Sequence, residues 1–454
     1  MKVHFIAIGG SAMHNLAIAL VKKGYTVSGS DDEIFEPSRS RLKKYGILPE
    51  KEGWYAENIQ PNLDAVIVGM HAKEDNPELH RAQELGIPVF SYPEYLYEQA
   101  KDKIRVVIGG SHGKTTITSM ILHVMQFHNM ECDYMVGAQL EGFEVMVEIT
   151  PTANVMILEG DEYLTSPLDK RPKFHLYEPD IALISGIAWD HINVFPTFEM
   201  YVDQFRIFAD LITPYGTLVY CEADPEVKKI GDNSRNDIDK KPYGLPSFKV
   251  KEGITYVLLD GQKIPLKVFG EHNLLNINGA RLVCNQLGVS DAAFYEAIQS
   301  FSGASKRLEK VAENDQTTVY KDFAHSPSKL KATTSAVHAQ FPDRKLVACL
   351  ELHTYSSLNE KFLDQYKSCM DSADEAIVYF NPHTIQLKRL PAITPGQVKQ
   401  AFARADLIVY TDSKKLLNDL LAKNWQNTNL LMMSSGNFDG IDFRELGENI
   451  TLNN

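Results

Sequence analysis

Short apolar segments alternate with amphipathic stretches along the whole 454-residue chain, and this alternation restricts the possible folds more than any other feature. Strands that are apolar on both faces and separated by helices predict parallel sheets with right-handed crossovers. We therefore expect an α/β protein with three consecutive domains, spanning residues 1–101, 102–303 and 304–454. A glycine-punctuated stretch at 251–270 predicts a small hairpin within this frame. Apolar segments of strand length occupy residues 2–10, 64–70, 106–108, 153–158, 180–187, 216–221, 345–352, 375–380, 406–411 and 429–433.

The charge and the cysteine pattern exclude several classes of function. The formal net charge is −13, so long-range repulsion opposes non-specific binding to nucleic acid or to an anionic membrane. The five cysteines include no C-x-x-C pair, which argues against a zinc cluster or a disulfide framework. No apolar run approaches the roughly 20 residues of a membrane span, and the first residues lack the features of a signal peptide. We expect a reduced, cytoplasmic protein with small-molecule partners; the sequence does not indicate an oligomeric state.

The stretch VVIGGSHGKTTITSM, which begins at Val106, has the form of a strand, a glycine-rich loop and a helix. In this arrangement Lys114 can reach β- and γ-phosphates, and the Thr115 hydroxyl can hold Mg²⁺. The usual phosphate loop has four residues between its first glycine and the Gly-Lys pair, whereas Gly109 leaves three and Gly110 leaves two. The flanking strand and helix argue against a chance match. We predict that ATP phosphates bind to Gly110, Ser111, His112, Gly113, Lys114, Thr115 and Thr116.

A second glycine-rich turn lies in IAIGGSAM near the start, and SGSD ends the next predicted strand. Such a turn places backbone N–H groups against a phosphate, and Asp31 can meet a ribose hydroxyl. The third glycine of the G-x-G-x-x-G fingerprint is missing, because Ser11, Ala12 and Met13 follow Gly10. This favours a diphosphate ligand other than NAD. An NAD site, as in a dehydrogenase, and a tight turn without a ligand are the alternatives.

Candidate metal ligands follow the ends of two predicted strands. Glu159 comes directly after one strand, and Asp190 and His191 come after another. Because ligands gather at the carboxyl ends of parallel strands, Thr115, Glu159 and His191 can converge on one hard cation. Taken singly, a histidine such as His191 is more often structural; taken together with the loop, the metal role is favoured.

Two further polar clusters lie toward the third predicted domain. FGEHNLLNINGA places its polar residues at the start of a predicted helix, where helix capping is the alternative explanation. KRLEK and YKDFAHSP fall near the domain junction and after a strand, where a surface loop is the alternative. Both clusters lie where a third domain could close over a nucleotide; their candidate residues are His272, Asn273, Asn276, Arg307, Asp322 and His325.

Taken in order, these motifs resemble those of the Mur ligases, ATP-dependent enzymes that join amino acids or peptides to peptidoglycan precursors. GGSHGKTT fits the short nucleotide loop of that family, FGEHNLLNINGA its H-N-x-x-N signature, and KDFAHSP its aspartate–aromatic–small–His–x–Pro signature. The resemblance covers nearly the whole chain. It implies a Rossmann-like N-terminal domain, a P-loop-type central ATPase domain and a Rossmann-like C-terminal domain. The carbamylated lysine of several relatives has no counterpart, since no lysine lies between His191 and Lys228, so Glu159 or Asp161 would have to help hold a second Mg²⁺.

The resemblance also implies a reaction and a set of site residues. ATP would phosphorylate a muramyl carboxylate, and an amine would then displace phosphate from the acyl phosphate. The catalytic residues would be Lys114, Glu159, His191 and Arg307, with Mg²⁺ held by Thr115, Glu159 and His191. Further ATP contacts would come from Asn273, Asn276, Asp322 and His325. The UDP-linked substrate would contact Gly10, Ser11, Ala12, Met13, Ser30, Asp31 and His71.

The glycine turn with SGSD is similar to the branch of the family that binds UDP-N-acetylmuramate. One member of this branch adds L-alanine, and another adds the intact tripeptide L-alanyl-γ-D-glutamyl-meso-diaminopimelate. EGDEYLTSPLDKRPKFHLY, DDEIFEPSRSRL and MMSSGNFDGI resemble the tripeptide-adding member, whereas ELHTYSS resembles the alanine-adding one. Lys306 also stands where relatives often have arginine. We favour the tripeptide as acceptor, bound by Glu351, His353, Tyr355 and Asn437, for which strand-end packing is the alternative explanation.

Overall fold

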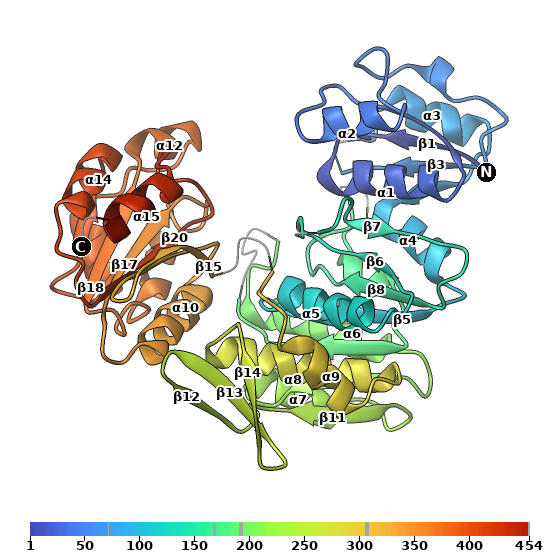
Figure 1. Cartoon of the computed structure of the whole chain (residues 1–454). Helices are drawn as coiled ribbons and strands as arrows, with labels where there is room; N and C mark the ends of the chain where they lie inside the picture. The colour runs from blue at the N-terminus through green and yellow to red at the C-terminus, as the bar shows by residue number, and fades with distance from the viewer. Residues whose placement is uncertain (71, 141, 167–168, 190–193, 305–307, 453–454) are drawn as a thin grey trace. The chain divides into compact units, whose positions relative to one another are not determined.

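The computed structural model describes residues 1–70, 72–140, 142–166, 169–189, 194–304 and 308–452. The chain divides into two compact units. Unit 1 comprises Met1–Leu245 and Leu275–Ile298, and unit 2 comprises Pro246–Leu274 and Gln299–Asn454. In Figure 1, unit 1 runs from blue to green and includes most of the yellow helices, and unit 2 includes the green-yellow hairpin and the orange and red elements. None of the helices in the described ranges has the length and apolar composition that a bilayer crossing requires.

A four-stranded sheet forms the first part of unit 1. Its strands are β1 (Lys2–Ile6), β2 (Thr26–Ser30), β3 (Ala65–Val68) and β4 (Val89–Ser91), in the order β2-β1-β3-β4. All three pairings are parallel, as the alternating pattern predicts. The connecting helices are α1 (Ser11–Lys22), α2 (Ser38–Lys44) and α3 (Pro77–Glu84). The polar and aromatic stretch that follows contains α4 (Tyr92–Ala100), which begins with a capping box formed by Ser91 and Glu94.

The second sheet of unit 1 has seven strands in the order β11-β10-β9-β5-β8-β6-β7. They are β5 (Ile104–Gly109), β6 (Asp133–Met135), β7 (Val147–Glu148), β8 (Val155–Glu159), β9 (Ile181–Ile184), β10 (Thr217–Cys221) and β11 (Asp239–Tyr243). The pairings are parallel except for β6 with the edge strand β7. Since β8, β5 and β9 are neighbours, their carboxyl ends lie along the same edge of the sheet. The accompanying helices are α5 (Lys114–Phe127), α6 (Phe198–Asp210), α7 (Pro225–Asn233), α8 (Glu271–Gln286) and α9 (Asp291–Ile298).

Unit 2 contains two sheets. The predicted hairpin is present as β13 (Ile254–Leu259) and β14 (Gln262–Leu266), and β12 (Phe248–Lys251) extends it to three antiparallel strands. The larger sheet has the order β15-β16-β20-β17-β18-β19 and is parallel except for the edge strand β15. Its strands are β15 (Glu309–Glu313), β16 (Thr318–Asp322), β17 (Lys345–Leu352), β18 (Glu375–Phe380), β19 (Ile408–Tyr410) and β20 (Thr428–Met433). The helices are α10 (Pro327–Gln340), α11 (Glu360–Leu363), α12 (Pro382–Leu387), α13 (Pro395–Phe402), α14 (Ser413–Leu421) and α15 (Phe443–Leu452).

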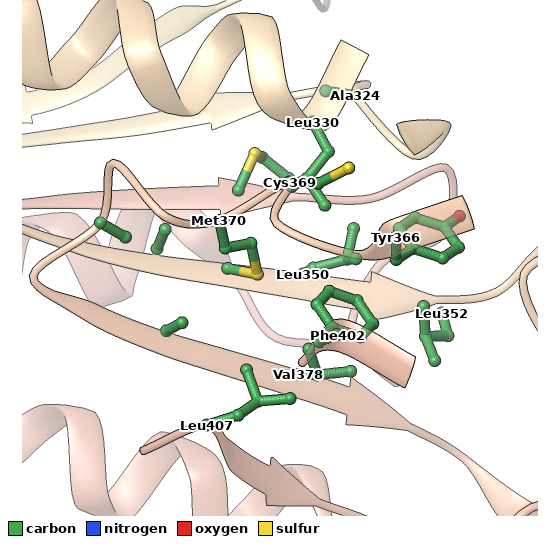
Figure 2. Packing of buried hydrophobic residues seen from close by; sticks show 14 of the residues in the cluster. Ala324, Leu330, Leu350, Leu352, Tyr366, Cys369, Met370, Val378, Phe402 and Leu407 are labelled. Carbon is green, nitrogen blue, oxygen red and sulfur yellow. The ribbon is translucent and has the colours of Figure 1, made fainter. Parts of the chain in front are cut away.

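The apolar sequence of β17 is explained by cores on both faces of the larger sheet. Leu350 and Leu352 belong to one buried cluster, in which Figure 2 shows them beside Val378, Tyr366 and Phe402. Val347 and Cys349, which alternate with the residues of the first cluster along the strand, belong to a second cluster. Successive side chains of a strand point to opposite faces, so a strand covered on both sides must be apolar throughout.

Candidate active site

The loop between β5 and α5 is built around two glycines in the left-handed region. Gly110 has φ +135° and Gly113 has φ +81°. A Cβ on Gly110 would collide with the Ser185 side chain, and one on Gly113 would lie 2.5 Å from Asn276 Oδ1. Ser185, the residue after β9, also holds the loop in place, because its hydroxyl donates to the carbonyl of His112. The helix α5 therefore starts at a turn in which two positions carry no side chain, so that the backbone N–H groups are accessible. Phosphates bind to helix N-termini of this kind.

Lys114 is the first residue of α5, and its ammonium group is held at the loop. Nζ donates to the Gly110 carbonyl at 2.7 Å and to Glu162 Oε2 at 2.5 Å. Burial alone would lower the pKa of Lys114, but the charges of Glu162 and Asp161 outweigh it and raise the pKa above its usual value. Lys114 is therefore a permanent cation beside the phosphate loop.

Glu162 was not among the residues that the sequence analysis selected. Its second carboxylate oxygen accepts a hydrogen bond from the Tyr201 hydroxyl at 2.9 Å, and Tyr201 contacts the Ser111 hydroxyl at 2.8 Å. Ser111 also accepts from the Ala188 N–H at 2.9 Å. The position of Glu162 just after β8, within ILEGDEY, is the signal that could have identified it. Tyr201 lies in α6, where no motif pointed to it.

Thr115 and Glu159 lie together, as the metal-site prediction requires. Thr115 Oγ1 donates to Glu159 Oε1 at 2.7 Å, and the Gly137 N–H donates to Glu159 Oε2 at 2.9 Å. A hydroxyl and a carboxylate are the hard oxygen ligands that Mg²⁺ prefers, so this pair fits that ion. His191, the third predicted ligand, lies outside the described residues, as does Asp190. Among the residues that are described, no group of three His, Cys, Asp or Glu side chains forms a metal cluster.

Asp161 is the other carboxylate that the sequence analysis considered for a second Mg²⁺. Its Oδ2 lies 2.6 Å from Lys173 Nζ. Burial alone would raise the pKa of Asp161, but the charges of Lys173 and Lys114 lower it below its usual value. Asp161 is thus ionised and already paired with a cation contributed by the DKRPKF segment.

The glycine turn of the four-stranded sheet is closed by Asp31. The Gly9 N–H donates to Asp31 Oδ2 at 2.7 Å, and the Asp32 N–H donates to Oδ1 at 3.0 Å. Burial raises the pKa of Asp31 to about 6, and the Gly9 hydrogen bond opposes the shift. Ser11 and Ala12 begin α1 and are exposed. Asp31 therefore orders the turn and leaves the first residues of α1 open to a ligand.

The remaining residues predicted for the UDP substrate fall in different places. Met13 is buried in the first turn of α1. The Ser30 hydroxyl donates to the Glu78 carboxylate, and both side chains are buried, so this hydroxyl is already used within the protein. Gly10 precedes α1 as its N-terminal flanking residue. His71 lies outside the described residues.

The H-N-x-x-N stretch is divided between the two units. Asn276 belongs to unit 1, where its Oδ1 faces the position of a Gly113 side chain. Asn273 belongs to unit 2 and donates to the Phe269 carbonyl at 2.8 Å, and burial lowers the pKa of the adjacent His272 against the opposing charge of Asp322. His272 and Asn273 therefore interact with other residues of unit 2. Asn276 is the residue of this stretch that lies at the phosphate loop.

The aspartate–aromatic–small–His signature follows β16 in unit 2. Asp322 Oδ2 accepts from the Thr333 hydroxyl at 2.7 Å. His325 Nδ1 lies 2.9 Å from the Phe323 carbonyl, and the His325 carbonyl accepts from the Tyr366 hydroxyl at 2.6 Å. Arg307 and Lys306 lie outside the described residues.

The residues predicted for the acceptor lie at the ends of the neighbouring strands β17 and β20. The buried Glu351 accepts from the Ser434 hydroxyl at 2.5 Å and from the Phe438 N–H at 2.8 Å, and its other oxygen is 3.6 Å from His353 Nδ1. Glu351 thus fixes the turn that carries Asn437, which is exposed. Tyr355 is 58% exposed.

Comparison with known proteins covers nearly the whole chain. The model of the "Mur ligase family, catalytic domain" matches residues 2–104, that of the "Mur ligase middle domain" matches 108–284, and that of the "Mur ligase, glutamate ligase domain" matches 306–436. The chain belongs to the Mur ligase family. It is therefore an ATP-dependent, amide-bond-forming ligase with the three-domain α/β architecture of that family, and the prediction of fold class is confirmed.

The relatives of this Mur ligase include both kinds of enzyme in the UDP-N-acetylmuramate branch. It is 32% identical over 388 residues to the UDP-N-acetylmuramate–L-alanine ligase of a Sulfurihydrogenibium strain, covering 83% of this chain and 82% of that one. It is 28% identical over 453 residues to the UDP-N-acetylmuramate–L-alanyl-γ-D-glutamyl-meso-2,6-diaminoheptandioate ligase of Escherichia coli, covering 97% and 96%. The crystal structure of the alanine ligase MurC from Thermotoga maritima matches with a TM-score of 0.67 at 21% identity, covering 100% and 99%.

Proposed function

We propose that this Mur ligase joins the muramyl carboxylate of UDP-N-acetylmuramate to the amine of the tripeptide L-alanyl-γ-D-glutamyl-meso-diaminopimelate, with ATP converted to ADP and phosphate. One observation carries the choice of acceptor. The DKRPKF segment, which resembles the tripeptide-adding enzyme, folds back on the end of β8, where the Lys173 N–H donates to the Tyr163 carbonyl at 3.0 Å. Its Lys173 ammonium pairs with Asp161 at 2.6 Å. We infer that the segment forms part of the active-site wall, because Asp161 also interacts with the charge of Lys114.

The phosphoryl-transfer half of the proposed reaction rests on positioning and charge. Gly110 and Gly113 allow the loop backbone to approach the phosphates, and Lys114 places a permanent positive charge beside them. Thr115 and Glu159 would hold Mg²⁺, which when bound neutralises charge on the phosphate oxygens. The resulting acyl phosphate is sensitive to water, so the substrate carboxylate and the amine must be brought together in an enclosed site.

The acceptor half of the reaction would use the polar cluster at the ends of β17 and β20. Glu351 holds the Ser434–Phe438 turn in place, and this turn and His353 present the exposed polar atoms. We assign Asn437 and His353 to direct contact with the peptide, and Glu351 to positioning them. Tyr355, which is exposed, would contribute an aromatic face.

Phosphate release with alternative acceptors tests the proposal. The assay contains UDP-N-acetylmuramate, ATP and Mg²⁺, with either the tripeptide or L-alanine, and the product is identified by mass. We expect turnover with the tripeptide to exceed turnover with L-alanine by at least about 10²-fold in kcat/KM, because a site built for polar groups discriminates strongly against an acceptor that lacks them. Equal or greater turnover with L-alanine would reject the tripeptide assignment.

The alanine-adding activity is the second candidate, and two observations favour it. ELHTYSS retains the His353 and Tyr355 pattern that resembles the alanine-adding enzyme. The relative that is 32% identical also bears that name. The same acceptor comparison decides between the two activities, and its controls omit ATP or UDP-N-acetylmuramate in turn.

A further inference from the structure

A buried asparagine joins the two sheets of unit 1 at the proposed substrate site. Asn15 lies in the second turn of α1 and is 3% exposed. Its Nδ2 donates to the carbonyl of Ser11, the first residue of that helix, at 2.8 Å. Its Oδ1 accepts from the N–H of Met146, immediately before β7 of the seven-stranded sheet, at 3.0 Å. A buried amide whose donor and acceptor are both used fixes the distance between the two backbones that it contacts.

The backbone that receives this contact continues to the proposed metal ligand. The Val136 N–H donates to the Met146 carbonyl at 2.9 Å, so these two residues are paired across the segment between β6 and β7. The next residue is Gly137, whose N–H donates to Glu159 Oε2 at 2.9 Å. A path of hydrogen bonds, joined by the peptide bond between Val136 and Gly137, therefore runs from the first turn of α1 to Glu159 and on to Thr115.

Peripheral contacts also join α1 and α2 to the segment between β6 and β7. Arg41 in α2 donates to Gln139 Oε1 at 2.6 Å, and Lys22 in α1 donates to Glu144 Oε2 at 2.9 Å. Lys22 and Glu144 are exposed, and an exposed ion pair contributes little to stability. Asn15 is thus the buried centre of the contact, and these two peripheral contacts form its rim.

We infer that Asn15 is a positioning residue that couples occupancy of the UDP-substrate turn to the Thr115–Glu159 pair at the nucleotide loop. This inference rests on the proposed function, because it assumes that α1 begins at the UDP-substrate site and that Glu159 holds Mg²⁺. A ligand that orders the Ser11 end of α1 also orders Met146, and hence Gly137 and the Glu159 carboxylate. Binding at either site then favours the geometry required by the other.

Calorimetric titration of UDP-N-acetylmuramate, with and without saturating Mg²⁺ and a non-hydrolysable ATP analogue, tests this coupling. In the unmodified protein we expect the nucleotide to tighten binding by at least about fivefold, the lower end of typical coupling between sites. In Asn15→Ala this factor should fall to near one, while the protein still binds each ligand alone. Steady-state assays of the same variant should show a higher KM for UDP-N-acetylmuramate and a higher Mg²⁺ requirement.

Asn76→Ala is the matched control. Asn76 is also a buried asparagine of the four-stranded sheet region, where its side chain caps α3 by accepting from the Glu78 N–H at 2.9 Å and the Leu79 N–H at 3.1 Å. It should lower the melting temperature without changing the coupling factor. If Asn15→Ala does not fold, Arg41→Gln removes a rim contact instead and should reduce the factor about twofold.

The outcomes separate this inference from the proposed function. Failure of the unmodified protein to bind UDP-N-acetylmuramate at all would overturn both. Normal binding and turnover with no effect of the nucleotide on affinity, or with the same coupling factor in Asn15→Ala, would overturn the role of Asn15 alone.

Discussion

At the scale of single residues, the site depends on charges whose partners are already in place. Lys114 is paired with Glu162, and Asp161 is paired with Lys173. An incoming phosphate does not have to ionise Lys114, because its positive charge is already maintained by the carboxylates of Glu162, Asp161 and Glu159. It has only to replace Glu162 as the partner of the ammonium group.

Replacing this lysine tests that assignment. Lys114→Ala should lower kcat by at least about 10²–10³-fold, because a preorganised charge at the phosphates is lost. UDP-N-acetylmuramate should still bind with nearly unchanged affinity by calorimetry. Glu162→Gln is the control, since it removes the partner and keeps the lysine, and it should retain most of the activity. Undiminished phosphate release by Lys114→Ala would exclude the loop as the ATP site.

The raised pKa of Asp31 predicts how the stability of the folded protein depends on pH. Its pKa is raised to about 6 in the folded protein, so the folded state holds a proton more tightly than the unfolded state does. The contribution of Asp31 to stability is therefore greatest below pH about 4 and is lost as the pH rises through 6. Asp31→Asn should match the unmodified protein at pH 4 and be more stable at pH 7.5, by at most about 3 kcal/mol. Thermal melts at the two pH values measure this difference.

The same substitution should weaken the proposed ligand interaction. A carboxylate at position 31 accepts from Gly9 and can accept from a ribose hydroxyl, and an amide is a poorer acceptor. Asp31→Asn should therefore bind UDP-N-acetylmuramate more weakly at pH 7.5 although the protein is more stable. Unchanged affinity would remove Asp31 from the substrate site.

Sequence patterns identify some of these residues as site candidates and miss others. Lys114, Thr115, Glu159 and Asp31 follow strands or open helices, so the rule that parallel strands end at one edge predicts where in the fold they lie. Asn15 and Tyr201 lie inside helices and act through contacts with distant segments. No local spacing encodes such contacts, because they arise only when two sheets or a helix and a loop pack together.

At the scale of elements, the loop between β5 and α5 has a backbone conformation that requires glycine at a specific position. Gly113 combines a left-handed conformation with a neighbour at the position of its missing side chain. The alternation of strands and helices predicted the parallel sheets. It did not predict the antiparallel edge strands β7 and β15, because a two- or five-residue strand beside an already predicted sheet carries no hydrophobic pattern of its own.

Two glycine substitutions separate these effects. Gly24→Ala places a Cβ in open space at φ +92°, so it should lower the melting temperature by about 2–4 °C through backbone strain alone. Gly113→Ala adds a collision with Asn276 and should lower it further while raising the KM for ATP. Equal effects of the two changes on ATP binding would show that the contact between Asn276 and the loop is unimportant.

At the scale of the whole molecule, the proposed ligands divide between the units. The phosphate loop, the Thr115–Glu159 pair and the Asp31 turn all lie in unit 1, whereas the proposed acceptor cluster lies in unit 2. The domain limits at residues 101 and 303 stay predictions. The family membership predicted from the motifs is confirmed, whereas the choice of acceptor stays a proposal that rests on a few short segments.

Differential scanning calorimetry should show this division. We expect more than one unfolding transition, and UDP-N-acetylmuramate at about 100 times its dissociation constant should stabilise only the transition of unit 1, by about 2.7 kcal/mol. The tripeptide alone should act on the other transition. Asp31→Ala is the control, and it should abolish the first shift without affecting the second. A single transition that every ligand shifts equally would contradict this division.

The path of the chain has a consequence for how this protein can be taken apart. Unit 2 begins at Pro246, is interrupted inside α8 after Leu274, and resumes at Gln299. No single cut therefore yields both units, since a fragment ending at Leu245 lacks α9 and the part of α8 that belongs to unit 1. Dissection would require an excision and a religation: residues 275–298 joined after Leu245 by a short linker for one half, and residues 246–274 joined to residue 299 for the other.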